Sequence, residues 1–212
     1  MPWFVAEVSS NHNGDLERAL RFIDVAASSG FDAVKFQLFR VDDLFSSAVL
    51  EKSKEHRDRK KYELSPKFIP ELSRRARDLG LSFGLTPFSL EHVAFLEPYV
   101  DFFKIASYEL LWHDLLRRVA STSKPMVVST GMADMAEIFE ALAILRSVGV
   151  LELTLLHCVS AYPLKHADAN LAAIETIRSA TGLDVGWSDH SRHAAVINRA
   201  VHRWGATMVE AH

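Results

Sequence analysis

Charged side chains interrupt or follow short apolar segments at several points of this 212-residue sequence. Lys35 and Lys104 each stand inside such a segment, and a lysine buried in a strand is seldom structural unless it is paired. Two lysines that converge can hold a doubly charged anion such as a phosphate or a carboxylate. The plainer interpretation is that they neutralise Glu7, Glu109 or Glu210, and the two interpretations are compatible for an empty site.

Two histidines close the last two apolar segments. His190 and His212 could bring two imidazoles to one divalent cation if the segments are neighbouring strands. A single histidine is more often a hydrogen-bonded core residue, but a pair at adjacent strand ends favours a metal site. Cys158, the one cysteine, has no evident partner that would stabilise a thiolate, so we assign it no nucleophilic role.

Eight short β-rich segments must position these groups, and each is followed by an amphipathic segment with helical spacing. They cover residues 4–8, 33–38, 82–86, 102–106, 126–129, 153–159, 184–187 and 207–210. Alternating strands and helices indicate a parallel α/β sheet, and eight units favour a (β/α)8 TIM barrel over an open doubly wound sheet. We expect one catalytic barrel domain over residues 1–212. The sequence ends directly after the eighth strand, so we expect either a fragment of a longer protein or a barrel closed by something outside this sequence.

Side chains that point into a barrel recur at every second residue of a strand. Counting by two predicts a polar ring at the carboxyl ends, formed by Glu7, Lys35, Gln37, Thr86, Lys104, Ser129, Ser160, Ser188, His190, Glu210 and His212. A lone serine or threonine there is usually a satisfied loop hydroxyl. Unpaired buried charges are costly, however, so a ring with two lysines, two glutamates and two histidines predicts an active site.

Local signals support the same division into elements. Asp134 with Glu137 forms a capping-box pattern, Ser89 is a suitable N-cap, and glycines stand where helices should stop. Pro70 predicts an irregular start of the helix over 65–79. The charged segment 51–61 is interpreted as a solvated insertion after the second strand, because acids interrupt its bases.

The composition argues against several classes of partner. A formal net charge of −3 gives no general attraction to nucleic acid or to an anionic membrane. No apolar run approaches the ~20 residues that span a bilayer, and the start has no signal-peptide pattern. A single cysteine fits a reducing compartment. We therefore expect a cytoplasmic protein with no nucleic-acid or membrane partner.

Ten short segments then carry a family resemblance along the whole sequence. They are Ala6-Glu7, Asn11-His12-Asn13-Gly14-Asp15, Ala33-Val34-Lys35-Phe36-Gln37, Thr86-Pro87-Phe88, Lys104-Ile105-Ala106-Ser107, Ser129-Thr130-Gly131-Met132, Leu156-His157-Cys158-Val159-Ser160, Tyr162-Pro163, Ser188-Asp189-His190 and Glu210-Ala211-His212. In this order they resemble the N-acetylneuraminate (sialic acid) synthase family, which includes legionaminic, pseudaminic and spore-coat polysaccharide synthases.

The resemblance implies a barrel enzyme that condenses phosphoenolpyruvate with N-acetylmannosamine or a related N-acyl hexosamine. The products would be a nine-carbon 2-keto sugar acid and phosphate, and a divalent metal, Mn²⁺ or Mg²⁺, would be bound by His190 and His212. The implied roles divide the other residues into a catalytic set and a substrate-binding set. The catalytic set is Glu7, Lys35, Lys104 and Glu210, and the substrate-binding set is Thr86, Ser107, Glu109, Ser129, Ser160, Tyr162 and Ser188. For a full-length protein the resemblance implies a homodimer.

Two departures from the family pattern stand out. Tyr108 follows Ser107 where relatives usually carry glycine, and the segment 191–193 after His190 also differs. Two other hypotheses stay open: a Schiff-base aldolase that uses Lys35 or Lys104, and a non-catalytic binding protein derived from the family. The acceptor sugar is not determined by the sequence.

Overall fold

Eight parallel strands form a closed barrel in which each strand pairs with the next along the chain and β1 pairs with β8. The computed structural model describes all of residues 1–212. The strands are β1 (Trp3–Glu7), β2 (Ala33–Leu38), β3 (Ser82–Pro87), β4 (Phe102–Ile105), β5 (Met126–Ser129), β6 (Leu153–Cys158), β7 (Asp184–Asp189) and β8 (Met208–Ala211). The predicted TIM barrel is thus confirmed, with strand bounds within two residues of those expected from the sequence.

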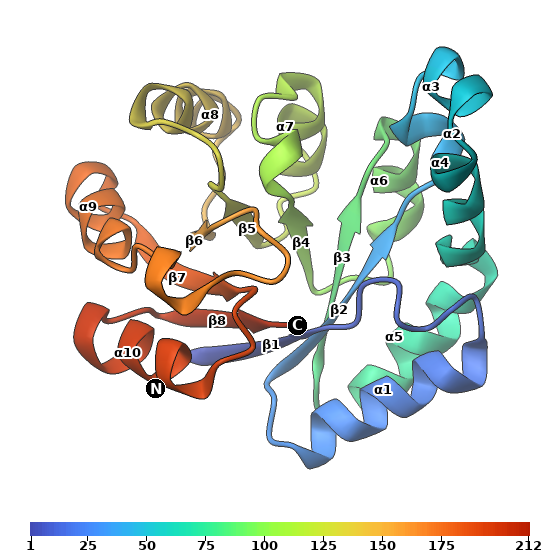
Figure 1. The fold of residues 1–212 in the computed structure, drawn as a ribbon, viewed down its shortest axis with the longest axis horizontal. Coiled ribbons are helices and arrows are strands. Elements are labelled where there is room, and N and C mark those ends of the chain that lie inside the picture. Colours follow the sequence, from blue (N-terminus) through green and yellow to red (C-terminus); the bar gives the residue numbers. More distant parts are fainter.

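Helices follow the first seven strands and surround the sheet (Figure 1). The α-helices are α1 (Leu16–Ser28), α2 (Val41–Leu44), α3 (Ser47–Lys52), α4 (Lys54–Asp58), α5 (Ile69–Asp78), α6 (Leu90–Leu96), α7 (His113–Ala120), α8 (Met135–Val148), α9 (Ala172–Thr181) and α10 (Ala194–Trp204). Four 3-10 turns complete the list: η1 (Arg59–Tyr62), η2 (Pro66–Phe68), η3 (Ser107–Glu109) and η4 (His166–Asp168). None of the helices is long and apolar enough to cross a membrane.

The helix ends follow the chemistry of their sequences. The Asp134 side chain and the Glu137 side chain each accept a backbone hydrogen bond at the start of α8, which completes the expected capping box. Gly149 ends the same helix in a left-handed conformation that glycine adopts without a Cβ clash. Pro70 lies in the first turn of α5, directly after η2, so the helix does begin irregularly there.

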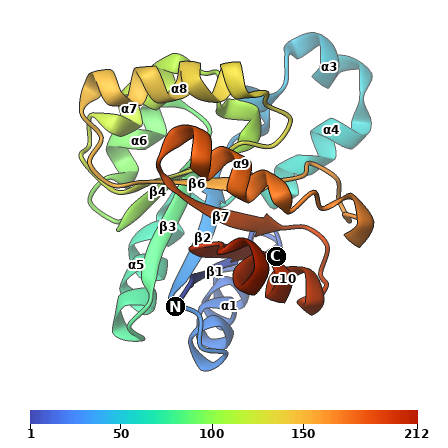
Figure 2. The same ribbon diagram turned by 90° about the vertical axis from the view of Figure 1, so that its left-hand side faces the viewer.

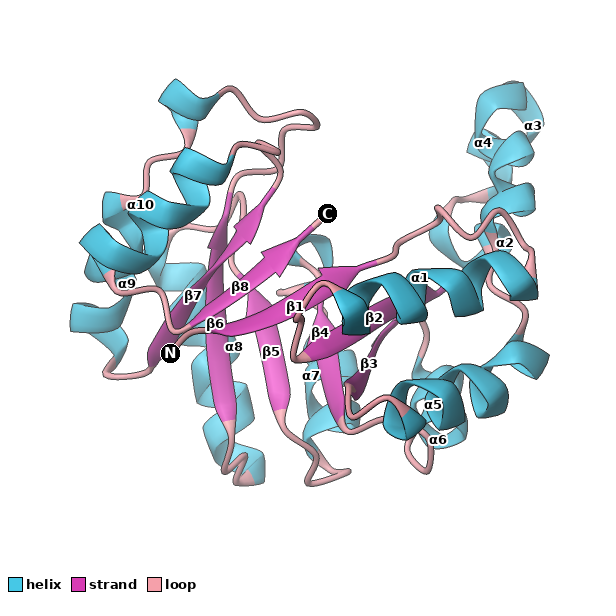
Figure 3. Cartoon of the chain, turned by 90° about the horizontal axis from the view of Figure 1, so that it is seen from below, coloured by secondary structure: helices cyan, strands magenta, loops and turns pink.

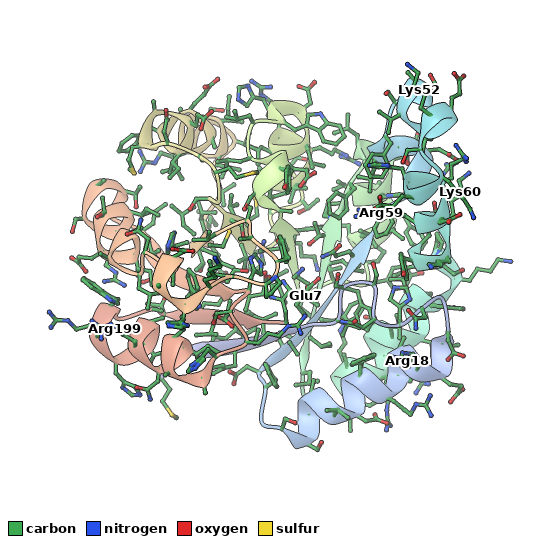
Figure 4. All side chains as sticks on the ribbon, in the orientation of Figure 1. Glu7, Arg18, Lys52, Arg59, Lys60 and Arg199 are labelled. Carbon is green, nitrogen blue, oxygen red and sulfur yellow. The ribbon has the colours of Figure 1, made fainter.

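The charged insertion between β2 and β3 is helical and mostly exposed. Its elements α3, α4 and η1 contain no buried residue, and α3 and α4 project away from the barrel (Figures 2 and 3). The Lys52 and Lys60 side chains extend outward there (Figure 4). The solvated interpretation of this segment is therefore confirmed.

The hydrophobic core has two parts, separated by the sheet. The larger cluster contains 41 buried residues, drawn from the outward faces of the strands and the inward faces of the helices. The smaller cluster fills the barrel interior and consists of Val5, Ala33, Phe102, Val127, Leu156 and Met208. A Cβ at Gly84 would lie 2.1 Å from the Phe102 ring, so the ring fills the space that glycine leaves. This apolar plug forms the floor beneath the polar ring.

Barrel closure needs no additional element. Trp3, Phe4, Val5 and Ala6 of β1 pair in register with Met208, Val209, Glu210 and Ala211 of β8. The sequence left two alternatives open, a fragment of a longer protein or a barrel closed by something outside the sequence. The direct pairing of the first and eighth strands contradicts only the second of them.

Candidate active site

The carboxyl ends of the strands surround a small polar cavity of about 60 Å³. Its lining is Lys35, Gln37, Thr86, Lys104, Ala106, Ser107, Tyr108, Ser129, Cys158, Ser160, Tyr162, Ser188, His190, Glu210 and His212. Eleven of the thirteen site residues predicted from the sequence belong to this lining.

 The two exceptions are Glu7 and Glu109. Glu7 contacts two lining residues, Lys35 and Gln37, and its label lies near the centre of the molecule in Figure 4.

Lys35 is held from both sides by carboxylates. Glu7 and Lys35 are direct partners in the β1–β2 register, and their side chains form a fully buried ion pair. The Lys35 Nζ also lies 3.7 Å from Glu210 Oε2 and donates to Thr86 Oγ1 at 3.3 Å. The second Glu7 oxygen accepts from the Gln37 amide at 2.6 Å. Lys35 is therefore already neutralised by protein groups, as the plainer interpretation proposed.

The positive charge of Lys104 is less fully compensated than that of Lys35. Its Nζ donates to Ser129 Oγ at 2.6 Å and to the Ile105 carbonyl at 3.0 Å, while the nearest carboxylate oxygen, Glu210 Oε1, is 3.9 Å away. Ser188, the register partner of Glu210, donates to the same oxygen at 2.8 Å. The positive charge of Lys104 is therefore offset only in part, by the more distant Glu210.

Burial and charge shift the pKa values of the two lysines in opposite directions. Burial lowers the pKa of Lys104, and the carboxylate of Glu210 only partly opposes this. Burial acts in the same way on Lys35, but the carboxylates of Glu7 and Glu210 outweigh it and raise its pKa. Burial would raise the pKa of Glu210, yet Lys104 and Lys35 lower it to about 2. The cavity lining thus holds an ionised glutamate between two lysines whose pKa values are shifted in opposite directions.

The two histidines lie side by side at the rim. Their ring centroids are 4.5 Å apart, and the rings are nearly perpendicular. His190 Nδ1 lies 2.7 Å from the Val159 carbonyl and His212 Nδ1 lies 2.9 Å from the Asp189 carbonyl. A carbonyl oxygen only accepts, so each Nδ1 must carry the proton. In the neutral ring, Nε2 then keeps its lone pair.

This arrangement fits a metal ion with few protein ligands. A histidine that binds metal through one nitrogen usually donates its other N–H to a carbonyl or carboxylate, as both rings do. Burial lowers the pKa of His190, which favours the neutral ring that a metal requires. No group of three or more histidine, cysteine, aspartate or glutamate side chains is placed to hold a metal. An ion bound here would need water or substrate oxygen to complete its coordination.

The wall between β4, β5 and β6 is tightly packed. Ser107 Oγ accepts from the Gly131 N–H at 3.0 Å and lies 3.1 Å from Cys158 Sγ. A Cβ at Gly131 would lie within 2.9 Å of Ser107, Cys158 and Ser160 side-chain atoms. Glycine is needed here because three side chains of the cavity wall converge on it. Tyr162, beyond Ser160, stacks on His190 with 4.1 Å between the ring centroids.

Glu109 is the predicted substrate-binding residue that the structure does not bring into the cavity lining. It lies in η3, where strand periodicity no longer applies, and its Oε2 is buried without a hydrogen-bond partner. Burial raises its pKa to about 7, with Lys104 opposing the shift. Glu109 is therefore close enough to Lys104 to feel its charge but does not face the open space.

Four lining residues had been given no functional role from the sequence. Gln37 was predicted as a member of the polar ring, and Cys158 has the same inward parity in its strand, so the sequence carried that signal. Ala106 and Tyr108 follow β4, where the chain enters η3 and parity gives no guidance.

Comparisons with known proteins agree with this geometry. Residues 22–212 match the NeuB family. The N,N'-diacetyllegionaminic acid synthase of Campylobacter jejuni is 37% identical over 221 residues, which cover 98% of this chain and 66% of that protein. An uncharacterized protein of Methanocaldococcus jannaschii is 39% identical, and the match covers 99% of this chain and 61% of that protein. The chain therefore spans less than two thirds of the length of these relatives.

A solved structure supports the same relationship. The N-acetylneuraminic acid (sialic acid) synthetase of Leptospira borgpetersenii superimposes with a TM-score of 0.92 at 34% identity, over 99% of this chain and 72% of that one. Sequence and fold agree over nearly the whole chain, and it belongs to the NeuB family.

Proposed function

We propose that this chain condenses phosphoenolpyruvate with an N-acyl hexosamine, such as N-acetylmannosamine, to form a nine-carbon 2-keto sugar acid and phosphate. The observation that carries the proposal is the position of Glu210 between Lys35 and Lys104, below the His190–His212 pair. Membership of the NeuB family and the likeness to legionaminic and sialic acid synthases support the same reaction class.

The anionic substrate is assigned to the lysine and hydroxyl side of the cavity. Lys104 supplies the positive charge, because Lys35 is already paired with Glu7. Hydroxyl groups surround the same space and can donate to phosphate or carboxylate oxygens. They belong to Thr86, Ser107, Ser129, Ser160 and Ser188. Their main contribution is to hold the enol in a fixed orientation toward the sugar aldehyde.

The bond changes define what the site must provide. C3 of phosphoenolpyruvate attacks the aldehyde carbon of the open-chain sugar, and the aldehyde oxygen takes up a proton. Positive charge develops at C2, where a water molecule adds and loses a proton. The resulting tetrahedral carbon expels phosphate by cleavage of its C–O bond, which leaves the 2-keto group. The balance is one phosphoenolpyruvate, one sugar and one water to one keto acid and one phosphate.

Glu210 and Glu7 are assigned to charge and proton handling. The low pKa of Glu210 keeps it ionised, so it can stabilise positive charge that develops at C2. Glu7 holds Lys35 and Gln37 in place through an ion pair and a hydrogen bond. Either carboxylate could receive the proton of the added water if the water reaches its oxygen.

His190 and His212 are assigned to a divalent ion, Mn²⁺ or Mg²⁺. Their neutral Nε2 atoms would hold it, and Tyr162 packs against His190 and limits the ring's movement. When bound, such an ion supplies Lewis-acid polarisation of an aldehyde oxygen.

The test is phosphate release from phosphoenolpyruvate with a panel of N-acyl hexosamines, with Mn²⁺, with Mg²⁺ and with chelator. We expect stoichiometric phosphate and keto acid that depend on both the sugar and the metal. No release with any sugar by folded, metal-loaded protein would support the non-catalytic alternative.

One observation favours a second candidate, the Schiff-base aldolase. Burial lowers the pKa of Lys104, which is a property that an imine-forming lysine requires. Borohydride treatment with pyruvate distinguishes the two candidates. A covalent adduct at Lys104, detected by mass spectrometry, would favour the aldolase, and its absence together with phosphate release would favour the condensation.

A further inference from the structure

Tyr108 is a large aromatic residue at the mouth of the cavity that the proposed mechanism does not use. It lines the cavity, yet 72% of the residue is exposed to solvent. It does not contribute a buried packing surface to the core. A ring in this position is available to a ligand that enters the site.

The backbone that carries Tyr108 is held on both sides. Ser107 is fixed to β5 and β6 through its contacts with the Gly131 N–H and the Cys158 sulfur. Within η3, the Glu109 N–H donates to the Ala106 carbonyl at 3.1 Å, and the Leu110 N–H donates to the Ser107 carbonyl at 3.3 Å. The position of the ring is therefore set mainly by its own side-chain torsions, from a fixed anchor.

Tyr162 stands at the same mouth, after β6, and is 68% exposed. Both tyrosines line the same cavity, and each is mostly exposed to solvent. Tyr162 is engaged by His190, whereas no other aromatic ring stacks on Tyr108. Tyr108 thus presents a largely exposed ring with no aromatic partner inside the chain.

The chemistry of that face selects the kind of ligand. The face of an aromatic ring is the negative side of its quadrupole, so it disfavours a phosphate or carboxylate and favours C–H groups of partial positive charge. An amino sugar offers such C–H groups on its carbon chain and on its N-acyl methyl. We propose that Tyr108 is a specificity-determining residue that packs against the acceptor sugar. This inference rests on the proposed function and assigns the sugar, not phosphoenolpyruvate, to the Tyr108 side of the mouth.

The test compares Tyr108→Ala and Tyr108→Phe with Phe139→Ala, a control that removes a 42% exposed ring on α8 outside the cavity. Steady-state kinetics with Mn²⁺ give KM for each substrate over a panel of 2-acetamido and 2,4-diacetamido hexoses. In parallel, saturation-transfer NMR with chelator present measures sugar binding without turnover. Calorimetry measures phosphoenolpyruvate affinity.

Loss of the ring should weaken sugar binding selectively. We expect Tyr108→Ala to raise KM and Kd for the preferred sugar about fivefold to tenfold, which corresponds to the apolar area that one ring face covers. Phosphoenolpyruvate affinity should stay within about twofold of wild type, and Tyr108→Phe and Phe139→Ala should stay within about twofold for both substrates.

The outcomes separate this inference from the proposed function. Turnover with an unchanged sugar KM in Tyr108→Ala would overturn the Tyr108 assignment alone, as would an equal loss of phosphoenolpyruvate affinity. Sugar binding without turnover would contradict the proposed function, and the NMR comparison would still decide the role of Tyr108. A wild-type protein that binds none of the sugars would overturn both.

Discussion

Lys104 Nζ and Glu210 Oε1 lie 3.9 Å apart, although these residues come from strands on opposite sides of the barrel. β4 and β8 are diametrically opposed in the closed strand order, so the two side chains meet across the centre. Lys35, from β2, reaches the other oxygen of the same carboxylate at 3.7 Å. Lys35, Lys104 and Glu210 therefore form one electrostatic unit, and removal of any one of these charges changes the pKa values of the other two.

Removal of Lys35 should destabilise the fold. Lys35→Ala leaves Glu7 buried without its ion-pair partner, and breaking a buried pair in this way costs about 3 to 5 kcal/mol. Denaturant unfolding of Lys35→Ala, Lys35→Met with Glu7→Gln, and the exposed control Lys60→Ala measures this. We expect the double variant to recover part of the loss and the control to stay near wild type. A stable Lys35→Ala protein would show that Lys35 is not a structural counter-ion.

Phosphoenolpyruvate affinity should fall as pH rises. The protonated form of Lys104 attracts the anion, and burial lowers the pKa of that lysine below its ordinary 10.5. Deprotonation therefore begins at lower pH than for an exposed lysine, and anion binding should be accompanied by proton uptake in the pH range where Lys104 loses its proton. Calorimetry in buffers of different ionisation enthalpy detects that proton. Lys104→Arg, which stays charged, should remove the uptake, and uptake that persists in this variant would assign the proton to another group.

Loss of His190 should remove metal binding with little effect on stability. His190→Ala gives up one hydrogen bond to the Val159 carbonyl, worth about 1 kcal/mol. Mn²⁺ titration followed by electron paramagnetic resonance should show weak or no binding, whereas His193→Ala, an exposed histidine nearby, should bind normally. Normal Mn²⁺ binding with a much lower melting temperature would identify His190 as a packing residue.

The pH dependence of the unfolding free energy should show the raised pKa of Glu109. Its pKa is 4.5 in the unfolded reference and about 7 in the folded protein, because burial favours the protonated form. Its contribution to stability is complete below pH 4.5 and is lost as pH rises through about 7. Glu109→Gln should therefore flatten the stability profile over this range and stabilise the protein above it. Glu152→Gln, an exposed control, should leave the profile unchanged, and a Glu109→Gln profile like that of wild type would contradict the buried-acid assignment.

A methyl group at Gly84 should lower the unfolding free energy, because it would clash with the apolar plug inside the barrel. Gly84→Ala places a Cβ on the Phe102 ring, and overpacking of this kind costs about 1 to 3 kcal/mol. Phe102→Leu makes room, so the double variant should be more stable than the sum of the two single effects predicts. Strict additivity in the unfolding free energies would show that the ring moves aside without cost.

Strand periodicity explains why much of the site was predictable. Lys35, Ser129, Ser188 and Glu210 lie within regular strands, where alternate residues must face the barrel interior. The same rule gave the inward direction of Cys158, whose position in the lining the sequence interpretation did not use.

Pairings and turns were harder to predict. Nothing in the sequence shows that Lys35, not Lys104, takes the close carboxylates, because that choice depends on the tilt and register of three strands. Glu109 and Tyr108 lie in η3, where one residue more or less in the turn redirects a side chain. Tyr108 consequently lines the cavity, whereas Glu109 does not.

The pairing of β1 with β8 has a consequence for how the chain folds. These strands are joined last in any order that follows sequence proximity, because almost the entire chain separates them. Glu7 and Lys35 come from the first part of the chain, and Glu210 arrives only when β8 docks. We therefore expect the β1–β8 pairing and the approach of Glu210 to Lys35 to form together. Hydrogen exchange at the β1 amides should accordingly report global unfolding, not local opening.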